Sequence, residues 1–271
     1  MSEFLDRISK LSPQRLALLA DELNERLQDA ERSRYVPLAV VGIGCRLPGG
    51  VQSPEEFWTL LRNGIDAVGE VPASRWDTAA FYDSNPDTPG KMSTHWGGFI
   101  DAPDQFDPKF FGIAPAEAAS MDPQQRLLLE TTWESLEHAG IAPTSLSGTR
   151  TGVFIGLCNA DYGQVALNQP RESITPYLAS GLSHAIAAGR ISYVLGLQGP
   201  SLAIDTSCSA SLVAVHLACQ SLRLGECDAA LAGGVNLILN PDITIALSQS
   251  RMMAPDGKCK AFSDNANGFV R

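Results

Sequence analysis

The segment from Ser201 to Gly225 constrains the fold most strongly, because it joins an apolar strand pattern directly to an apolar helix pattern. Residues 201–205 are short and apolar, and Gly199-Pro200 bounds them, which is typical of a buried strand. Residues 209–224 favour a helix, and Gly225 can end it in a left-handed conformation. The sequence therefore predicts a buried strand that turns at once into a buried helix.

A cysteine, Cys208, stands at this predicted junction. The first backbone N–H groups of a helix have no partner within it, and the helix dipole is positive there. Both effects favour a thiolate, and the same N–H groups can hold the oxyanion that forms when sulfur attacks a carbonyl. Ser209 and Ala210 are small, so a long acyl substrate could approach closely. On geometry alone, a nucleophile and a buried structural cysteine remain alternatives.

The stretch DTSCSAS at 205–211, followed by LVAVHLACQSLRLGECDAALAGGVN, resembles the active-site signature of β-ketoacyl synthases. It is similar in particular to ketosynthase domains of modular type I polyketide synthases. VVGIGCRLPGG near the start and MDPQQR at 121–126 resemble further family motifs, so the resemblance spans Pro37–Arg271. It implies an α/β fold of the thiolase-like type, here its N-terminal half, in which helices flank a mixed buried sheet, and it favours Cys208 as the nucleophile.

The resemblance also implies a reaction. Cys208 would accept an acyl chain from the phosphopantetheine arm of an acyl carrier protein, with its own backbone N–H as an oxyanion donor and Ser209 and Ala210 beside the substrate. A malonyl-type extender would then lose CO2, and its carbanion would attack the acyl thioester. No cofactor or metal is bound directly in this scheme, and a homodimer is expected.

The family uses two histidines for the condensation half of this reaction, in motifs of the form His-Gly-Thr-Gly-Thr and Asn-Ile-Gly-His. None of the four histidines in this sequence stands in such a motif. We therefore expect that this chain alone does not complete chain elongation. His184 is expected to pack or hydrogen bond within a helix. His216 lies two turns after Cys208, about 12 Å along the axis, too far for a direct hydrogen bond.

Residues 1–34 are predicted to form a separate docking or linker helix, and residues 35–271 the ketosynthase region. Ser12 can cap the helix and Pro13 suits its first position. One apolar stripe carries Leu16, Leu19, Leu23 and Leu27. A lone amphipathic helix of this length is marginal in water, so it favours a partner, either an upstream polyketide synthase subunit or its own twin. Packing on its own domain is the alternative.

Patterns elsewhere predict further elements. The expected buried strands are 37–44, 151–157 and 229–240, and Gly233-Gly234 in the last permits close approach. The expected helices are 53–62, 122–139, 176–188 and a helix or turn at 241–250, and His138 is expected to be a surface residue. Residues 159–175 are polar and loop-like, and residues 65–113 carry little periodicity.

Composition excludes several classes of function. A net charge of -10 disfavours nucleic-acid binding. No apolar run reaches the length of a membrane span and no signal peptide opens the chain, so a cytoplasmic location is expected. The six cysteines form no C-x-x-C pair, so neither zinc nor a disulfide framework is expected. Gly42-x-Gly44 lacks the third glycine of a dinucleotide fingerprint, because Leu47 takes that position.

Three other functions stay open at this stage. Within enzymes, the alternatives are a β-ketoacyl synthase of fatty acid biosynthesis or a thiolase. From a different class, the chain could be a non-catalytic docking or scaffold module. Replacing Cys208 by alanine separates the classes, because an enzyme would lose acylation whereas a docking module would keep its partner.

Overall fold

The computed structural model describes residues 8–34 and 36–271, and its main sheet has three parallel strands in the order β4-β3-β5. The central strand is β3 (Thr151–Gly156), with β4 (Ser201–Ile204) and β5 (Ala229–Gly234) beside it. Gly156 pairs with Ile204 on one side and with Gly234 on the other. All three strands therefore end at the same edge of the sheet, where parallel α/β folds place their functional residues.

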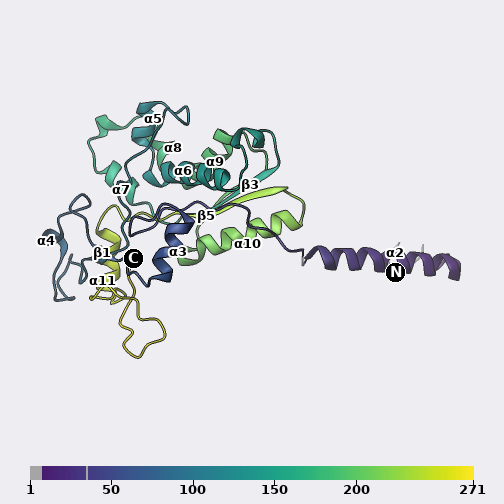
Figure 1. Ribbon diagram of the computed structural model, residues 1–271, viewed down its shortest axis with the longest axis horizontal. Coiled ribbons are helices and arrows are strands. Elements are labelled where there is room, and N and C mark those ends of the chain that lie inside the picture. The colour runs from purple at the N-terminus through teal and green to yellow at the C-terminus, as the bar shows by residue number, and fades with distance from the viewer. Residues whose placement is uncertain (1–7, 35) are drawn as a thin grey trace.

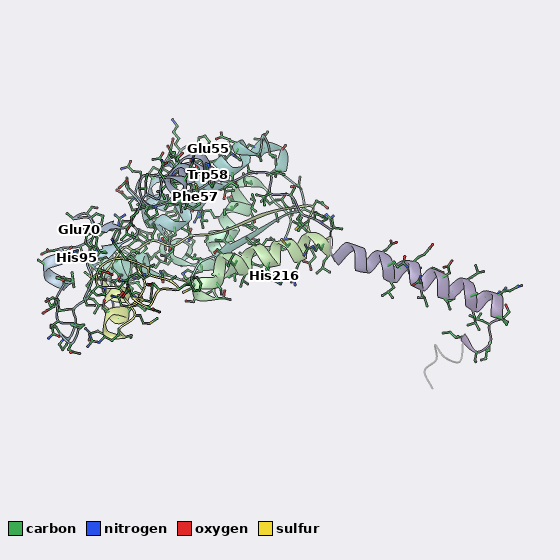
Figure 2. The ribbon with its side chains drawn as sticks, turned by 60° about the horizontal axis from the view of Figure 1, so that its bottom comes forward. Glu55, Phe57, Trp58, Glu70, His95 and His216 are labelled. Atoms are coloured by element: carbon green, nitrogen blue, oxygen red, sulfur yellow. The ribbon has the colours of Figure 1, made fainter. Side chains whose placement is uncertain are left out.

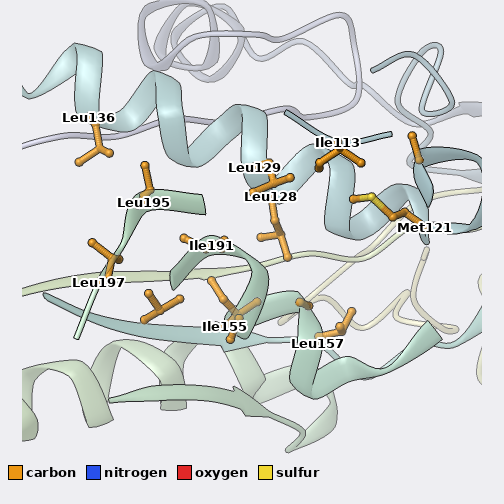
Figure 3. Close-up of a cluster of buried hydrophobic side chains, with 14 residues drawn as sticks. Ile113, Met121, Leu128, Leu129, Leu136, Ile155, Leu157, Ile191, Leu195 and Leu197 are labelled. Atoms are coloured by element: carbon orange, nitrogen blue, oxygen red, sulfur yellow. The ribbon is translucent and has the colours of Figure 1, made fainter. Parts of the chain in front are cut away.

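Helices cover both faces of this sheet. α6 (Pro123–His138) and α9 (His184–Leu195) lie on one face, and α10 (Ala210–Arg223) lies on the other (Figure 1). β3 is buried along its whole length, as a strand covered on both faces must be. The largest apolar cluster lies between β3, α6 and α9 (Figure 3) and includes Leu128, Leu129, Leu136, Val153, Ile155, Leu157, Ile191 and Leu195.

Capping residues fix where the helices begin. Ser53 caps α3 (Pro54–Arg62) by accepting the Glu56 N–H at 3.2 Å. Asp122 caps α6 by accepting the Gln124 N–H at 2.8 Å, and proline follows each cap. α10 is followed by Gly225 in a left-handed conformation with φ of 69°. These three predicted helices are confirmed.

The helix predicted near the N-terminus is also formed, as α2 (Pro13–Arg34). The Oγ of Ser12 accepts the N–H of Arg15 at 3.4 Å, as a cap should. α2 projects away from the sheet and its flanking helices (Figure 1), and the side chains of Leu23 and Leu27 are 48% and 57% exposed.

The remaining elements are short. They are β1 (Gly69–Glu70), α4 (Thr78–Phe81), β2 (Trp96–Gly97), α5 (Pro115–Ser120), η1 (Pro143–Leu146), α7 (Asp161–Leu167), η2 (Arg171–Ser173), α8 (Leu178–Leu182), η3 (Ser207–Ser209) and α11 (Asp242–Gln249). β1 and β2 form a small antiparallel ladder within the region predicted to have little periodicity. No helix in the described residues is long and apolar enough to cross a membrane.

The predicted buried strand at 37–44 is wrong. These residues belong to no strand, and Val40 and Val41 are 81% and 63% exposed. The segment lies on α6 instead: a Cβ on Gly42 would come within 2.1 Å of the Ser135 carbonyl oxygen. His138 is exposed near the end of α6, as predicted, and its Nδ1 atom accepts the N–H of Ile43 at 3.3 Å. The apolar pattern therefore reflects contact with a helix and not with a neighbouring strand.

Other boundaries also differ from the predictions. The polar stretch 159–175, predicted to be a loop, contains α7 and η2. The single helix predicted at 176–188 is two helices, α8 and α9, that meet at Ser183. The strand predicted at 229–240 ends at Gly234. The two outer strands are less buried than predicted, because each has only one neighbour in the sheet: Leu202 of β4 is 43% exposed.

Candidate active site

Cys208 lies at the junction that the sequence predicts. β4 ends at Ile204, Cys208 is the middle residue of the 3₁₀ turn η3, and α10 begins at Ala210. The thiol is exposed, so it is not a buried structural cysteine. The thiol stands at the beginning of a 14-residue helix, where the positive end of the helix dipole favours a thiolate. The next two amides are already bonded, Ser209 N–H to the Thr206 carbonyl oxygen at 3.4 Å and Ala210 N–H to that of Ser207. The arrangement suits a nucleophile that attacks a carbonyl.

The turn that carries Cys208 has a strained backbone. Ser207 has φ of 55°, in the left-handed region that non-glycine residues rarely adopt. Asp205 supports this conformation, because its Oδ1 atom accepts the Ser207 N–H at 3.0 Å. On the other side, the hydroxyl of Ser209 donates to the carbonyl oxygen of Thr206 at 2.9 Å. Such strain persists where surrounding contacts hold it, and it is common at functional sites.

The two small residues after Cys208 have different surroundings. Ser209 is exposed, whereas Ala210 is 5% exposed. Exposure therefore favours Ser209 over Ala210 as a neighbour of a substrate. The substrate-binding role of both stays a prediction.

A second thiol, Cys158, lies near Cys208. The sequence did not predict this neighbour. Leu157 donates its N–H to the carbonyl oxygen of Ile204 at 3.0 Å, so the chain after β3 still runs beside the chain after β4. Cys158 is half-buried, and burial raises the pKa of its thiol. The nearby charges of Asp205 and Cys208 raise this pKa further. The site therefore holds one exposed thiol and one half-buried thiol whose pKa is raised by burial.

Arg271 brings a positive charge to the same edge of the sheet. Its Nη1 atom donates to Thr244 Oγ1 at 3.0 Å, and its Nη2 atom is buried without a hydrogen-bond partner in the described residues. Burial lowers the pKa of this guanidinium, and the charges of Asp161 and Cys158 oppose that effect. Asp161 is itself buried, and its Oδ2 atom accepts the Leu239 N–H at 3.1 Å. The sequence offers no local signal for this grouping.

Polar side chains also fix the loop that follows β5. Asn159, which follows β3, donates to the side chain of Asn236. Gln124 accepts the Leu237 N–H at 3.2 Å and donates to the Asn159 carbonyl oxygen at 3.1 Å. The segments that follow β3 and β5 are thus joined to the start of α6 by these hydrogen bonds.

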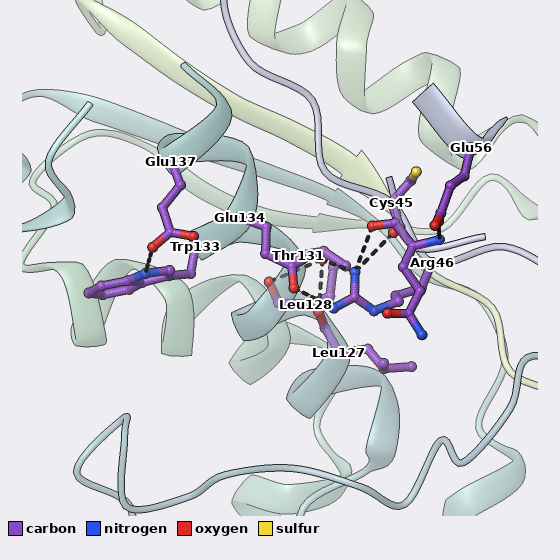
Figure 4. A network of polar contacts seen from close by, with 10 residues as sticks. Cys45, Arg46, Glu56, Leu127, Leu128, Thr131, Trp133, Glu134 and Glu137 are labelled. Carbon is purple, nitrogen blue, oxygen red and sulfur yellow. Dashed lines mark hydrogen bonds and ion pairs between the residues drawn. The ribbon is translucent and has the colours of Figure 1, made fainter. Parts of the chain in front are cut away.

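One pocket lies apart from the cysteine. It has a volume of about 320 Å³ and lies between α6, the 44–48 and 98–100 segments and the 234–238 loop. Arg46 lines it and donates to Glu134 and to the carbonyl oxygen of Cys45 at 3.1 Å (Figure 4). Cys208 is not among its lining residues.

The histidines form no metal-binding cluster among the described residues. His95 is near Glu70 at 3.9 Å and meets the ring of Tyr82 edge-on, while His216 lies on α10 (Figure 2). No group of three His, Cys, Asp or Glu side chains within residues 8–34 and 36–271 could hold a metal ion.

Known proteins resemble this chain along most of its length. The family model for the N-terminal domain of β-ketoacyl synthases matches residues 36–271. One subunit of the phenolphthiocerol/phthiocerol polyketide synthase of Mycobacterium tuberculosis is 54% identical over 271 residues, which cover all of this chain and 15% of that protein. Another subunit of the same synthase is 53% identical over 273 residues, and this chain covers 17% of it.

Solved ketosynthase structures share the fold. The oxazolomycin ketosynthase domain of Streptomyces albus aligns with a TM-score of 0.78 and 41% identity, covering 85% of this chain and 40% of that one. The ketosynthase from module 6 of the bacillaene synthase of Bacillus subtilis aligns with a TM-score of 0.77 and 40% identity, covering 86% and 38%. The chain thus spans less than half of these ketosynthases. It belongs to the β-ketoacyl synthase family, as the N-terminal half of a polyketide synthase ketosynthase domain with a thiolase-like fold.

Proposed function

We propose that this chain carries the acyl-accepting site of a polyketide ketosynthase and that Cys208 is its nucleophile. The observation that carries the proposal is the exposed thiol in the strained turn between β4 and α10. Family membership supports a condensing enzyme of polyketide assembly over a fatty-acid synthase or a thiolase, because the named relatives are polyketide synthase subunits.

The proposed step is a thioester exchange. The Cys208 thiolate attacks the carbonyl carbon of an acyl group carried on the phosphopantetheine of an acyl carrier protein. The carbonyl oxygen takes the electron pair, and the backbone N–H of Cys208 stabilises the oxyanion. The tetrahedral intermediate collapses, the bond to the phosphopantetheine sulfur breaks, and that thiolate takes a proton. The product is an acyl chain on Cys208 and a free carrier thiol.

In the complete domain, a malonyl-type extender would lose CO2, and the resulting carbanion would attack the acyl thioester and release Cys208. The 271-residue chain has none of its four histidines in the two family motifs that serve this half-reaction. We therefore assign acyl acceptance to this chain and expect that alone it does not complete the condensation.

The experiment is acylation of the purified chain with a simple acyl thioester, hexanoyl-N-acetylcysteamine, followed by intact-mass and peptide analysis. The wild-type chain should gain one acyl group on Cys208, and Cys208→Ala should gain none. Cys259→Ala is the matched control, because Cys259 is the other exposed cysteine in the described residues and should not matter. A folded wild-type chain with unmodified Cys208 would refute the proposal.

We also assign α2 to docking with an upstream polyketide synthase subunit, in a protein that forms a homodimer. The support is a helix that projects from the body (Figure 1) and exposes Leu23 and Leu27 of its apolar stripe. Docking without chemistry is the second candidate function, and the same observation favours it. Deletion of residues 1–30 should abolish binding of the upstream subunit and leave acylation intact, whereas Cys208→Ala should do the reverse. Loss of acylation on deletion would contradict the assignment.

A further inference from the structure

The first turn of α10 rests directly on the backbone of two strands. Gly156 ends β3 and Gly234 ends β5, and these two glycines are paired in the sheet. Ala210 and Ser211, the first two residues of α10, lie against them. We call these two glycines the glycine seat.

Neither position of the glycine seat has room for a side chain. A Cβ on Gly156 would lie 2.6 Å from both the Ala210 carbonyl carbon and the Ser211 nitrogen. A Cβ on Gly234 would lie 2.7 Å from the Cβ of Ser211. Carbon atoms in favourable contact are about 3.5–4.0 Å apart, so either substitution has to move the helix or the strand. The first clash is with backbone atoms, which no side-chain rotation can relieve.

Neither glycine is required for its own backbone conformation. Neither residue has a positive φ, so an alanine would fit the local backbone, and only the contact with α10 excludes it. Gly233, one residue before Gly234 in the same strand, has nothing within 4 Å of its Cβ position. Of the two adjacent glycines in β5, only Gly234 therefore makes the close approach to the start of α10.

The seat acts on Cys208 through the short chain between them. Only Ser209 separates Cys208 from Ala210, and the strained turn before Cys208 is fixed to β4 by Asp205. A shift of the first turn therefore moves the thiol and the amides beside it relative to the sheet edge. We propose that Gly156 and Gly234 are positioning residues for acyl transfer, because they set the depth at which α10 starts and hence where Cys208 and its N–H stand. This inference rests on the proposed function of Cys208.

The test compares Gly156→Ala with Gly233→Ala, which adds the same methyl group to a neighbouring strand position with open space. Two reactions of Cys208 are measured in each variant: acylation by hexanoyl-N-acetylcysteamine and alkylation by iodoacetamide. Acylation needs the thiol and the oxyanion donor in register, and a displacement of about 1 Å costs roughly 100-fold in rate. Alkylation needs only an accessible thiol.

We expect acylation of Gly156→Ala to fall about 100-fold relative to wild type, with a much smaller change in alkylation. Gly233→Ala should match wild type in both reactions. A change that affects both reactions equally, with a lowered melting temperature, would indicate a purely structural role and overturn the inference. Acylation of folded Gly156→Ala at the wild-type rate would overturn it as well.

A size exchange gives a second, independent test. The clash at Gly234 is with the Cβ of Ser211, so Gly234→Ala combined with Ser211→Gly removes it, since the Ser211 Cα would be 3.5 Å away. The double variant should recover most of the acylation lost in Gly234→Ala, measured against Ser211→Gly alone. Ser211→Gly should not rescue Gly156→Ala, because that clash involves backbone atoms. Should Gly156→Ala fail to fold, the Gly234 pair carries the test, and absence of rescue overturns the inference.

A failure of the proposed function can be distinguished from a failure of this inference about the glycine seat. If folded wild-type chain is not acylated, the nucleophile assignment fails, whatever the glycines do. Hydrogen exchange of residues 205–213 then still tests the seat: faster exchange in Gly156→Ala than in Gly233→Ala supports it, and equal exchange in the two variants contradicts it.

Discussion

The left-handed conformation of Ser207 gives a quantitative prediction about stability and acylation. A non-glycine residue in this conformation costs about 1–2 kcal/mol, and Ser207 adopts it with φ of 55°. Ser207→Gly removes that cost. The glycine also adds freedom to the unfolded chain, which opposes the gain by about 0.4–1 kcal/mol. The net expectation is a free energy of unfolding raised by about 0.5 kcal/mol, or a melting temperature raised by about 1–2 °C.

Acylation should change in the opposite direction. A glycine next to Cys208 lets the turn leave the single conformation that holds the thiol. If the added conformational entropy is worth about 1 kcal/mol, the rate of acylation falls about fivefold. Ser207→Ala keeps the strain and removes only the hydroxyl, whose oxygen lies 3.9 Å from the Cys208 sulfur. Ser207→Ala therefore separates the effect of the backbone from that of the hydroxyl.

The matched control is Phe262→Gly. Phe262 is fully exposed and has φ of 62°, so the substitution relieves the same strain without loss of a packed side chain. It should raise stability by a similar amount and leave acylation unchanged. The assays are thermal unfolding and the rate of adduct formation by intact mass. The reasoning is refuted if Ser207→Gly is less stable than wild type while Phe262→Gly is more stable, or if Ser207→Gly is acylated at the wild-type rate.

Two further predictions concern neighbouring residues. At a pH of about 7.5, iodoacetamide should label Cys208 and Cys259 well before Cys158, because Cys158 is half-buried and burial raises the pKa of its thiol. Raising the pH should speed the labelling of Cys158. Peptide mass spectrometry measures the order of labelling, and Cys158 labelled first would contradict the prediction. Arg46→Lys should lower the free energy of unfolding by about 1–2 kcal/mol. The reason is that lysine cannot reproduce the paired donation of Arg46 to both carboxylate oxygens of Glu134. Urea unfolding measures the effect, and an unchanged midpoint would show that the pair contributes little.

Local chemistry explains which elements the sequence could predict. Ser53 and Asp122 are followed by proline, and a capping side chain with proline behind it indicates a helix start without reference to the rest of the fold. The junction at Cys208 is predictable for the same reason, since a strand pattern and a helix pattern meet within a few residues. Each of these predictions depends on residues that are neighbours in the chain.

The failed predictions depend on which segment lies beside which. The apolar run at 37–44 has the pattern of a buried strand, but in the structure it lies on α6, so its exposed valines could not be distinguished from core residues by pattern. Cys158 was missed because its nearness to Cys208 follows from the register of β3 against β4. β3 ends at Gly156 and β4 begins only at Ser201, and no local motif specifies that these two strands pair.

The glycine seat could be predicted from the sequence only in part. The sequence shows that Gly233-Gly234 permits close approach, but it does not show what approaches or which of the two glycines matters. The structure separates them, because only Gly234 lies against α10 while Gly233 faces open space. Two features thus fix the position of Cys208. One is a local turn, which the sequence predicts, and the other is a contact between β3, β5 and α10, which forms only in the assembled sheet. A substitution at Gly156 leaves the local turn sequence intact and disturbs only that contact.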